Sequence, residues 1–362
     1  MRWDAQKTTT AAVPSGQPEP LVPLAGLVRS VRTPEFAGIT FHEVLSKSAL
    51  NRVPKSSGMP FSWTVNPYRG CSHACVYCFA RKTHSYLNLD TGLDFDTQVV
   101  VKTNVGEVLR REVGRASWNR EHVAMGTNTD PYQRAEGRYR LMPAIIRALA
   151  DSGTPFSILT KGTLLSRDIP LLKQAGTQVS VGMGISLAVL DPTLAHAVEP
   201  GTPTPRARLE LITRLRNAGL PCGVMAMPIL PWLTDSDEAL DALFGALAAA
   251  GATGVSVGAL HLRPGAREWY MGWLAKTHPG LVAGYQRLYR GGTYASGEYR
   301  AWLSERVQVH RRRHGLSAGA RFFREEGGAG SPASSSPASA ASAEPAAFGG
   351  DESRVAAEPT LF

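Results

Sequence analysis

Cysteine is scarce in this chain, and its placement is uneven. Four cysteines occur in 362 residues, and three of them, Cys71, Cys75 and Cys78, fall close together. Disulfide-stapled secreted proteins instead spread an even set of cysteines along a short chain. A tight group of three thiols is typical of a metal site or of thiol chemistry in a reducing compartment. The cysteine content therefore argues against a disulfide framework and favours a metal centre.

Long apolar runs are also missing. No stretch reaches the roughly 18 apolar residues that cross a bilayer, and the opening residues lack a basic segment leading into an apolar one. We therefore expect no membrane association and a cytoplasmic location.

Acidic residues are fewer than basic ones, which gives a formal net charge of +9. The most basic segment, 306–324, holds six arginines and two histidines and no acid. Such a balance favours a polyanionic partner such as nucleic acid, but a solvated basic helix end has the same composition. Both interpretations stay open.

Composition divides the chain into three parts. Residues 1–60 read as an N-terminal extension rich in Pro, Gly and Thr, with a short helix predicted over 41–50. Residues 61–325 have the apolar and charged content of a folded body. Residues 326–362 are mostly Gly, Ala, Ser and Pro, which bury too little apolar surface to offset chain entropy, so a disordered tail is expected.

The folded body alternates short apolar runs with longer amphipathic segments. After a first strand leading into Cys71, buried strands are predicted over 122–129, 156–162, 178–186, 222–230 and 254–262. Helices are predicted over 141–153, 168–176, 205–219 and 236–251, each ending at a glycine. A strand-helix repeat of this kind indicates right-handed βαβ units and a parallel sheet. The predicted fold class is α/β: a partial (β/α)6 TIM-like barrel with an N-terminal extension and a disordered C-terminal tail.

Polar residues follow several of these strands. In parallel α/β folds the functional residues gather at the carboxyl ends of the strands. We therefore expect one site to contain the following residues: Cys71, Cys75, Cys78, Thr127, Asn128, Asp130, Lys161, Ser186, His261 and Arg263.

The C-x3-C-x2-C spacing points to a metal centre with one ligand missing. Iron–sulfur clusters are normally held by four cysteines, so three would leave one iron open to an outside ligand, as a catalytic site requires. On a straight helix the outer two thiols would lie about 10 Å apart along the axis, so a loop is expected. A zinc site would need a fourth ligand, for which His73 and His84 are the nearest candidates.

This motif, followed by the aromatic Phe79, resembles the defining loop of the radical S-adenosylmethionine (radical SAM) enzymes. The stretches "NPYRGCSHACVYCFAR", "GLDFDTQVVVK", "GTNTDPYQ" and "ILTKG" are also similar to the subgroup that includes spore photoproduct lyase, a DNA repair enzyme. The resemblance implies a 4Fe-4S cluster on Cys71, Cys75 and Cys78, with S-adenosylmethionine on the open iron. It further implies reductive cleavage to a 5′-deoxyadenosyl radical that abstracts hydrogen from a substrate, and a flavodoxin- or ferredoxin-like reductant.

The resemblance suggests cofactor-binding roles at other strand ends. Lys161 would pair with the methionine carboxylate, and Phe79 belongs to the motif itself. The other residues expected to bind the cofactor are Thr127, Asn128, Asp130, Ser186 and Arg206. Each has an ordinary alternative, such as a lysine stem lying along a strand end, a helix cap at Asp130 or a solvated Arg206.

Cys222, the fourth cysteine, has two interpretations. A relative of the lyase would use a thiol outside the cluster as hydrogen donor, and Cys222 is the one available, which makes it a candidate catalytic residue. It also begins an apolar strand, where a free cysteine is ordinarily a small buried hydrophobe.

Three functions remain for the structure to weigh. The first is a radical SAM enzyme acting on a DNA lesion or modified nucleic acid. The second is radical modification of a protein or small molecule, and the third is a non-enzymatic zinc or iron–sulfur protein that binds nucleic acid. Residues 358–362, "EPTLF", resemble a peptide that binds the replication sliding clamp, which adds the clamp as a predicted partner.

Overall fold

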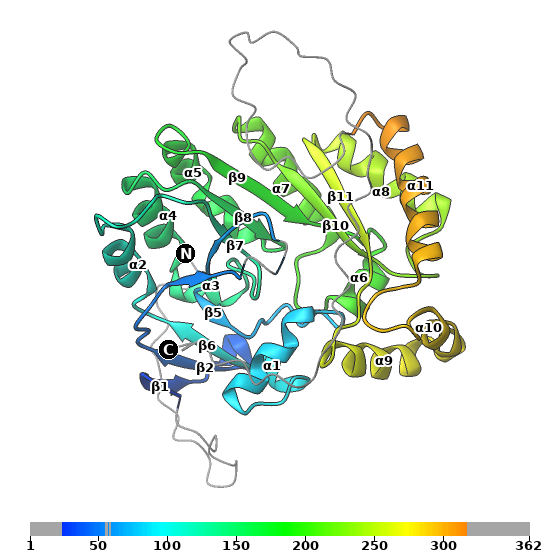
Figure 1. Cartoon of the computed structure of the whole chain (residues 1–362), viewed down its shortest axis with the longest axis horizontal. Coiled ribbons are helices and arrows are strands. Elements are labelled where there is room, and N and C mark those ends of the chain that lie inside the picture. The colour runs from blue at the N-terminus through cyan, green and yellow to red at the C-terminus, as the bar shows by residue number, and fades with distance from the viewer. Residues whose placement is uncertain (1–23, 55–56, 58, 317–362) are drawn as a thin grey trace.

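A parallel sheet forms the centre of the molecule. The computed structural model describes residues 24–54, 57 and 59–316. Seven strands pair in the order β11-β10-β9-β8-β7-β4-β3 (Figure 1). From β4 to β11 neighbouring strands are parallel, and β3 (Leu50–Arg52) adds antiparallel at the edge. The parallel strands are β4 (Trp63–Val65), β7 (Val123–Met125), β8 (Phe156–Thr160), β9 (Val181–Ser186), β10 (Gly223–Ile229) and β11 (Gly254–Ala259).

This arrangement confirms the predicted partial (β/α)6 barrel. The five predicted apolar runs each contain one of the strands β7 to β11, and "SWTVNPYRG" contains β4. β9 is buried at every position, as expected for a central strand covered on both faces. All six parallel strands therefore present their carboxyl ends at one edge of the sheet.

The predicted helices also form, and of the glycines expected at their ends Gly153, Gly219 and Gly251 have a positive φ, whereas Gly176 has a φ of −66°. They are α4 (Met142–Asp151), α5 (Ile169–Ala175), α7 (Pro205–Asn217) and α8 (Asp237–Ala249). Thr204 and Ser236 cap α7 and α8 by accepting hydrogen bonds from backbone N–H groups of the first turn. The remaining helical elements are α1 (Leu93–Thr97), α2 (Val105–Val113), α3 (Ala135–Tyr139), α6 (Pro192–Val198), α9 (Ala266–Thr277), α10 (Val282–Leu288), α11 (Gly297–Arg313), η1 (Pro34–Phe36), η3 (Phe79–Leu87), η4 (Thr163–Asp168) and η5 (Pro279–Leu281).

A second, four-stranded sheet has the order β1-β2-β6-β5. Its strands are β1 (Leu27–Val31), β2 (Thr40–Val44), β5 (Tyr68–Arg69) and β6 (Gln98–Lys102). The helix predicted over 41–50 is therefore wrong, because this segment supplies β2 and the start of β3. The sequence "TFHEV" is buried along its whole length, and its parallel pairing with β6 decides its conformation.

The predicted division of the chain meets the structure only in part. Residues 27–52 of the predicted extension contribute strands to both sheets. The predicted disordered tail, 326–362, and the clamp-binding peptide at its end lie outside the described residues. No helix in the described part of the chain is long and apolar enough to cross a membrane.

Three helices after β11, α9 to α11, cover the end of the barrel, and α11 lies along α8 (Figure 1). Two buried tyrosines of this region hold the loops that leave the last two strands. The Tyr285 hydroxyl donates to the Pro231 carbonyl at 2.9 Å, and the Tyr289 hydroxyl donates to the Leu260 carbonyl at 2.7 Å. These helices therefore help to shape the functional edge of the sheet.

Glu136 joins the small sheet to the barrel. Its fully buried carboxylate accepts hydrogen bonds from the Tyr68 hydroxyl at 2.6 Å and from the backbone N–H groups of Leu141 and Met142 at 3.0 Å. It also pairs with Arg167 at 2.8 Å. Since Tyr68 lies in β5, directly before the three cysteines, Glu136 anchors the strand that leads to them.

We predict that Glu136→Ala lowers the free energy of unfolding by about 3 kcal/mol, because it leaves several buried donors without a partner. Urea unfolding of the metal-free protein measures this. Glu107→Ala, which removes an exposed glutamate of α2, should change stability by less than about 0.5 kcal/mol. Equal stability of the two variants would contradict this role for Glu136.

Candidate active site

The three cysteines lie in an irregular loop between β5 and η3, as predicted. The loop is fixed by hydrogen bonds from the Cys71 N–H to the Phe95 carbonyl at 2.9 Å and from the Val76 N–H to the Val198 carbonyl at 3.0 Å. Gly201 packs so tightly on this loop that a Cβ atom there would lie 1.9 Å from the Ser72 carbonyl oxygen. Segments distant in sequence therefore hold the loop in place.

Arg81, the last residue of "RGCSHACVYCFAR", is a structural anchor of this loop that the sequence did not reveal. Its side chain is fully buried and donates to the Cys75 carbonyl at 3.0 Å and to Asp96 at 2.9 Å. The guanidinium also lies 4.8 Å from the ring centroid of Trp269. From its residue type alone Arg81 would be predicted to be solvated. Its contacts with Cys75, Asp96 and Trp269 show that it is buried.

A cavity of about 280 Å³ opens beside the cysteines at the carboxyl edge of the sheet. It gathers residues from the cysteine loop and from the ends of β7 to β11. Those among the predicted site residues that line it are Cys71, Cys75, Cys78, Phe79, Thr127, Asn128, Asp130, Lys161, Ser186 and His261. The structure brings these residues to one cavity, whereas Arg263, expected in the same site, is not among its lining residues.

The three thiols fit a multinuclear centre better than a single zinc ion. Zinc holds thiolates at about 2.3 Å, which brings their sulfurs within about 4 Å of one another. A structural zinc site also needs four ligands, and the loop supplies three cysteines. An iron–sulfur cluster held by three cysteines leaves one iron open to an outside ligand.

The two histidines proposed as a fourth zinc ligand have other partners. His73 Nδ1 lies 3.3 Å from Asp130, and His84 Nε2 lies 2.9 Å from the Gln98 carbonyl oxygen. Burial raises the pKa of the Cys75 thiol, and it raises the pKa of Cys78 to about 11. Metal binding would therefore displace protons from these thiols.

A network of buried charges lies beside the cysteine loop, whose Tyr77 hydroxyl donates to Glu199. Lys161 Nζ donates to Ser186 Oγ at 2.5 Å and lies 3.2 Å from Glu199 Oε1. Arg208 Nη2 approaches the other oxygen of Glu199 at 2.7 Å. Burial by itself would raise the pKa of Glu199, but Lys161 and Arg208 outweigh it and lower the pKa to about 2. The ammonium group of Lys161 is therefore fixed by Glu199 and Ser186 and lines the cavity.

The segment after β7 supplies further polar groups. Thr127 lines the cavity, and its hydroxyl oxygen is buried without a hydrogen-bond partner, as expected where a polar ligand would bind. Gly126 has a φ of 92°, and a Cβ there would lie 1.9 Å from the Leu159 carbonyl oxygen. This close approach of β7 to β8 is what brings Thr127 to the cavity wall.

Asp130 lines the same cavity, but its carboxylate oxygens already accept hydrogen bonds from other groups of the chain. It accepts hydrogen bonds from Thr160 Oγ1 at 2.5 Å and from the Lys161 N–H at 2.7 Å. It also binds the Tyr132 N–H at 2.9 Å in a local turn. Asp130 therefore orients the backbone of Lys161, which is a positioning role.

Two predicted site residues lie elsewhere. The side chain of Arg206 is 90% exposed and pairs with Glu210 one turn along α7, so its place at the cavity was wrongly predicted; Arg208, on the inner face of the same helix, reaches the site. Cys222 is fully buried in the apolar core. It precedes β10 and does not line the cavity, which that strand first reaches at Met225, and burial raises the pKa of its thiol to about 12. This position does not fit a hydrogen donor.

A row of side chains in tilted ring contact borders the cavity beside Phe79 and His261. Phe79 and His261 have ring centroids 5.8 Å apart, and His261 and Tyr294 are 6.1 Å apart. Arg263 lies over the other side of Phe79 at 5.6 Å. We call Arg263, Phe79, His261 and Tyr294 the mouth row.

The basic segment of the sequence is largely engaged within the protein. Arg306 pairs with Asp237 at 2.5 Å and Arg313 with Asp241 at 2.9 Å, both on α8. Arg311 donates to the Val255 carbonyl at 2.7 Å. In the described part of 306–324, these arginines hold α11 against the barrel. Fewer positive charges are therefore free to bind a partner than the composition of the segment suggested.

The fold and the site together define an α/β-barrel enzyme with an open three-thiol centre at the carboxyl edge of its sheet. The family model described as the radical SAM superfamily matches residues 65–244. The chain belongs to this superfamily and is an enzyme of the radical SAM type, which uses a 4Fe-4S cluster, S-adenosylmethionine and an electron donor.

Known proteins extend this comparison. An uncharacterized protein of Mycobacterium tuberculosis is 63% identical over 308 residues, covering 85% of this chain and 91% of that protein. A structure of spore photoproduct lyase complexed with dinucleoside spore photoproduct is similar in fold, with a TM-score of 0.58, 13% identity, and coverage of 77% of this chain and 80% of that one. A variant of the lyase with bound AdoMet and the same dinucleoside gives a TM-score of 0.57 at 14% identity and the same coverage.

We predict that Arg81→Lys lowers the iron content of anaerobically reconstituted protein several-fold, because a lysine cannot bond Cys75 and Asp96 at once. Arg206→Lys is the matched control and should take up iron like the unchanged protein. Iron and sulfide analysis measures both, and equal iron in Arg81→Lys would refute the anchoring role.

We predict that Lys161→Met weakens binding of S-adenosylmethionine to the reconstituted, unreduced protein by about tenfold or more, through loss of a charged hydrogen bond. Lys173→Met, which replaces an exposed lysine of α5, should leave the affinity for S-adenosylmethionine unchanged. Calorimetric titration gives both dissociation constants. If Lys161→Met bound the cofactor normally while remaining folded, Lys161 would not contact the carboxylate.

Proposed function

We propose that Cys71, Cys75 and Cys78 hold the 4Fe-4S cluster and that the enzyme acts on a nucleic acid, whose reacting base enters the cavity unstacked. With cluster and S-adenosylmethionine bound, one-electron reduction supplies methionine and a 5′-deoxyadenosyl radical, which takes a hydrogen atom from the substrate. Lys161, Ser186 and Thr127, which line the cavity together with the cysteines, would bind and orient the cofactor.

The mouth row is the observation that supports a nucleic-acid substrate. Tyr294 is 54% exposed and Phe79 is 39% exposed, so both offer ring faces to a ligand beside Cys78. Each base stacked on an aromatic side chain contributes about 1–3 kcal/mol, whatever the base. Arg263 adds a positive charge at one end of the row. A planar, anionic substrate suits this mouth.

The row is also held rigidly, as a binding surface requires. His261 and Tyr294 form an isolated antiparallel bridge, and the Leu262 N–H donates to the Thr293 carbonyl at 2.7 Å. Ring faces fixed before binding lose little conformational entropy when a base stacks on them.

The similarity to a lyase structure holding a dinucleoside photoproduct gives the proposal its second support, from the fold. The two sites need not finish the reaction in the same way. Among the described residues lining the cavity, the cysteines are the three of the loop. We therefore propose that hydrogen return, where it occurs, does not use a fourth thiol of this chain.

The test uses reconstituted enzyme, dithionite and S-adenosylmethionine with single-stranded and duplex oligonucleotides deuterated in their sugars and bases. We expect deuterium in the 5′-deoxyadenosine released, together with binding that weakens as salt rises. Cys75→Ala should release no 5′-deoxyadenosine. If the intact enzyme neither bound the oligonucleotides nor took up deuterium, while still cleaving the cofactor, the substrate would belong to another class.

A further inference from the structure

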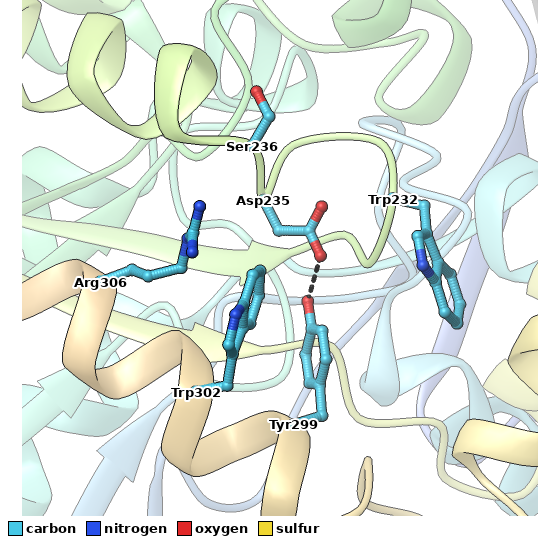
Figure 2. Close-up of a pocket in the computed structure, with 6 residues that line it drawn as sticks. All are labelled: Trp232, Asp235, Ser236, Tyr299, Trp302 and Arg306. Atoms are coloured by element: carbon cyan, nitrogen blue, oxygen red, sulfur yellow. Dashed lines mark hydrogen bonds between the residues drawn. The ribbon is translucent and has the colours of Figure 1, made fainter.

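A second pocket, of about 390 Å³, lies outside the cysteine cavity, between the loop after β10 and helix α11 (Figure 2). It is lined by Trp232, Asp235, Ser236, Tyr299, Trp302 and Arg306. None of these residues has a role in the chemistry described above. We call this set the outer pocket.

The outer pocket exposes large aromatic faces. Trp232 is 50% exposed and Trp302 is 37% exposed, although indole is among the more costly groups to leave in water. Tyr299 lies between them in the view of Figure 2, with its ring centroid 5.4 Å from that of Trp302. The walls therefore suit a flat, apolar group.

Trp232 is held in place at a conformational cost. Its φ of 61° lies in the left-handed region, which a side chain of this size rarely adopts. Its ring packs edge-on against Tyr285 at 5.4 Å and covers Gly284, where a Cβ would lie 3.2 Å from the indole. The loop behind it is tied by the Leu230 N–H, which donates to Thr234 Oγ1 at 2.8 Å. Such restraint is typical of a binding surface.

The polar groups of the outer pocket restrict its ligand. Asp235 is buried to 7% exposure, and one of its oxygens accepts the Tyr299 hydroxyl at 2.7 Å (Figure 2). A carboxylate repels phosphate but accepts hydrogen bonds from the amino and imino edge of a base. Arg306 already lies over Trp302 at 4.6 Å, so a free cation would meet a like charge. A nucleobase satisfies both constraints.

The outer pocket lies on the same rim as the mouth row. Ile229 and Ala259 are paired neighbours at the ends of β10 and β11, and the Leu260 N–H donates to the Ile229 carbonyl at 3.0 Å. Trp232 follows β10 by three residues, and His261 follows β11 by two. Because adjacent strands lie about 4.8 Å apart, the two loops leave the sheet side by side.

We propose that the outer pocket binds an unpaired base that flanks the reacting nucleotide in single-stranded nucleic acid. This inference rests on the proposed function, since it needs a nucleic-acid substrate. Stacking on Trp232 or Trp302 would fix the strand beside the cavity, while the mouth row receives the reacting base. The outer pocket thereby sets where along a strand the enzyme acts.

The test measures anisotropy of a fluorescein-labelled oligothymidylate with the reconstituted enzyme. Trp232→Ala and Trp302→Ala should each weaken binding about fivefold or more, and Trp302→Phe should restore most of the affinity because a ring remains. Tyr86→Ala removes a 68% exposed aromatic outside both sites and should bind like the unchanged enzyme. Release of 5′-deoxyadenosine without nucleic acid should be equal in all variants, which shows that they fold.

Oligonucleotides that lack one base test directly whether the outer pocket binds a base. Removing the base at one position of the oligonucleotide should weaken binding to the intact enzyme, but not to Trp302→Ala, where that contact is already lost. If the intact enzyme binds and the tryptophan variants bind equally well, the outer pocket is not a base site and the proposed function stands. If the intact enzyme does not bind, both proposals fall.

Discussion

Glu199 is the carboxylate on which the geometry of the cavity beside the cysteine loop depends. It follows α6, lies fully buried, and is shared by Lys161 from the end of β8, by Arg208 from α7 and by the hydroxyl of Tyr77 in the cysteine loop. Removing one partner of such a buried group costs about 3–5 kcal/mol, because a charge is left without compensation. Four segments are thereby locked around one wall of the cavity, with the positive charge of Lys161 facing inward.

The two sides of the active site are built by different parts of the chain. The cysteine loop and the ends of β7, β8 and β9 form one side, with charges and hydroxyl groups that are buried and mostly paired. The loops after β10 and β11, held by Tyr285 and Tyr289, form a rim of exposed rings. Rigid barrel strands thus position the radical chemistry, whereas the added C-terminal helices shape the surface a substrate meets.

Local patterns predicted much of this architecture. Apolar runs identified the strands β7 to β11, and polar residues at their ends identified six of the residues that line the cavity, because parallel strands deliver their carboxyl ends to one edge. Sequence patterns gave wrong predictions where the same type of residue is commonly found both buried and exposed. Arg206 and Arg208 are two residues apart on α7, and only packing shows that the first is solvated and the second buried. Likewise, "TFHEV" became a strand because β6 offered it a partner.

Patterns along the chain were enough to indicate the radical SAM superfamily and the barrel, because a motif of closely spaced thiols and the periodicity of apolar residues are both local features. Tertiary packing was needed to show that Arg81 anchors the cysteine loop, that Cys222 is buried before the start of β10, and that Arg306 and Arg313, in the described part of the basic segment, pair with α8. The same holds for the mouth row and the outer pocket, since their rings come from segments far apart in the chain. Burial and partnership depend on which surfaces meet, and no single stretch of sequence contains that information.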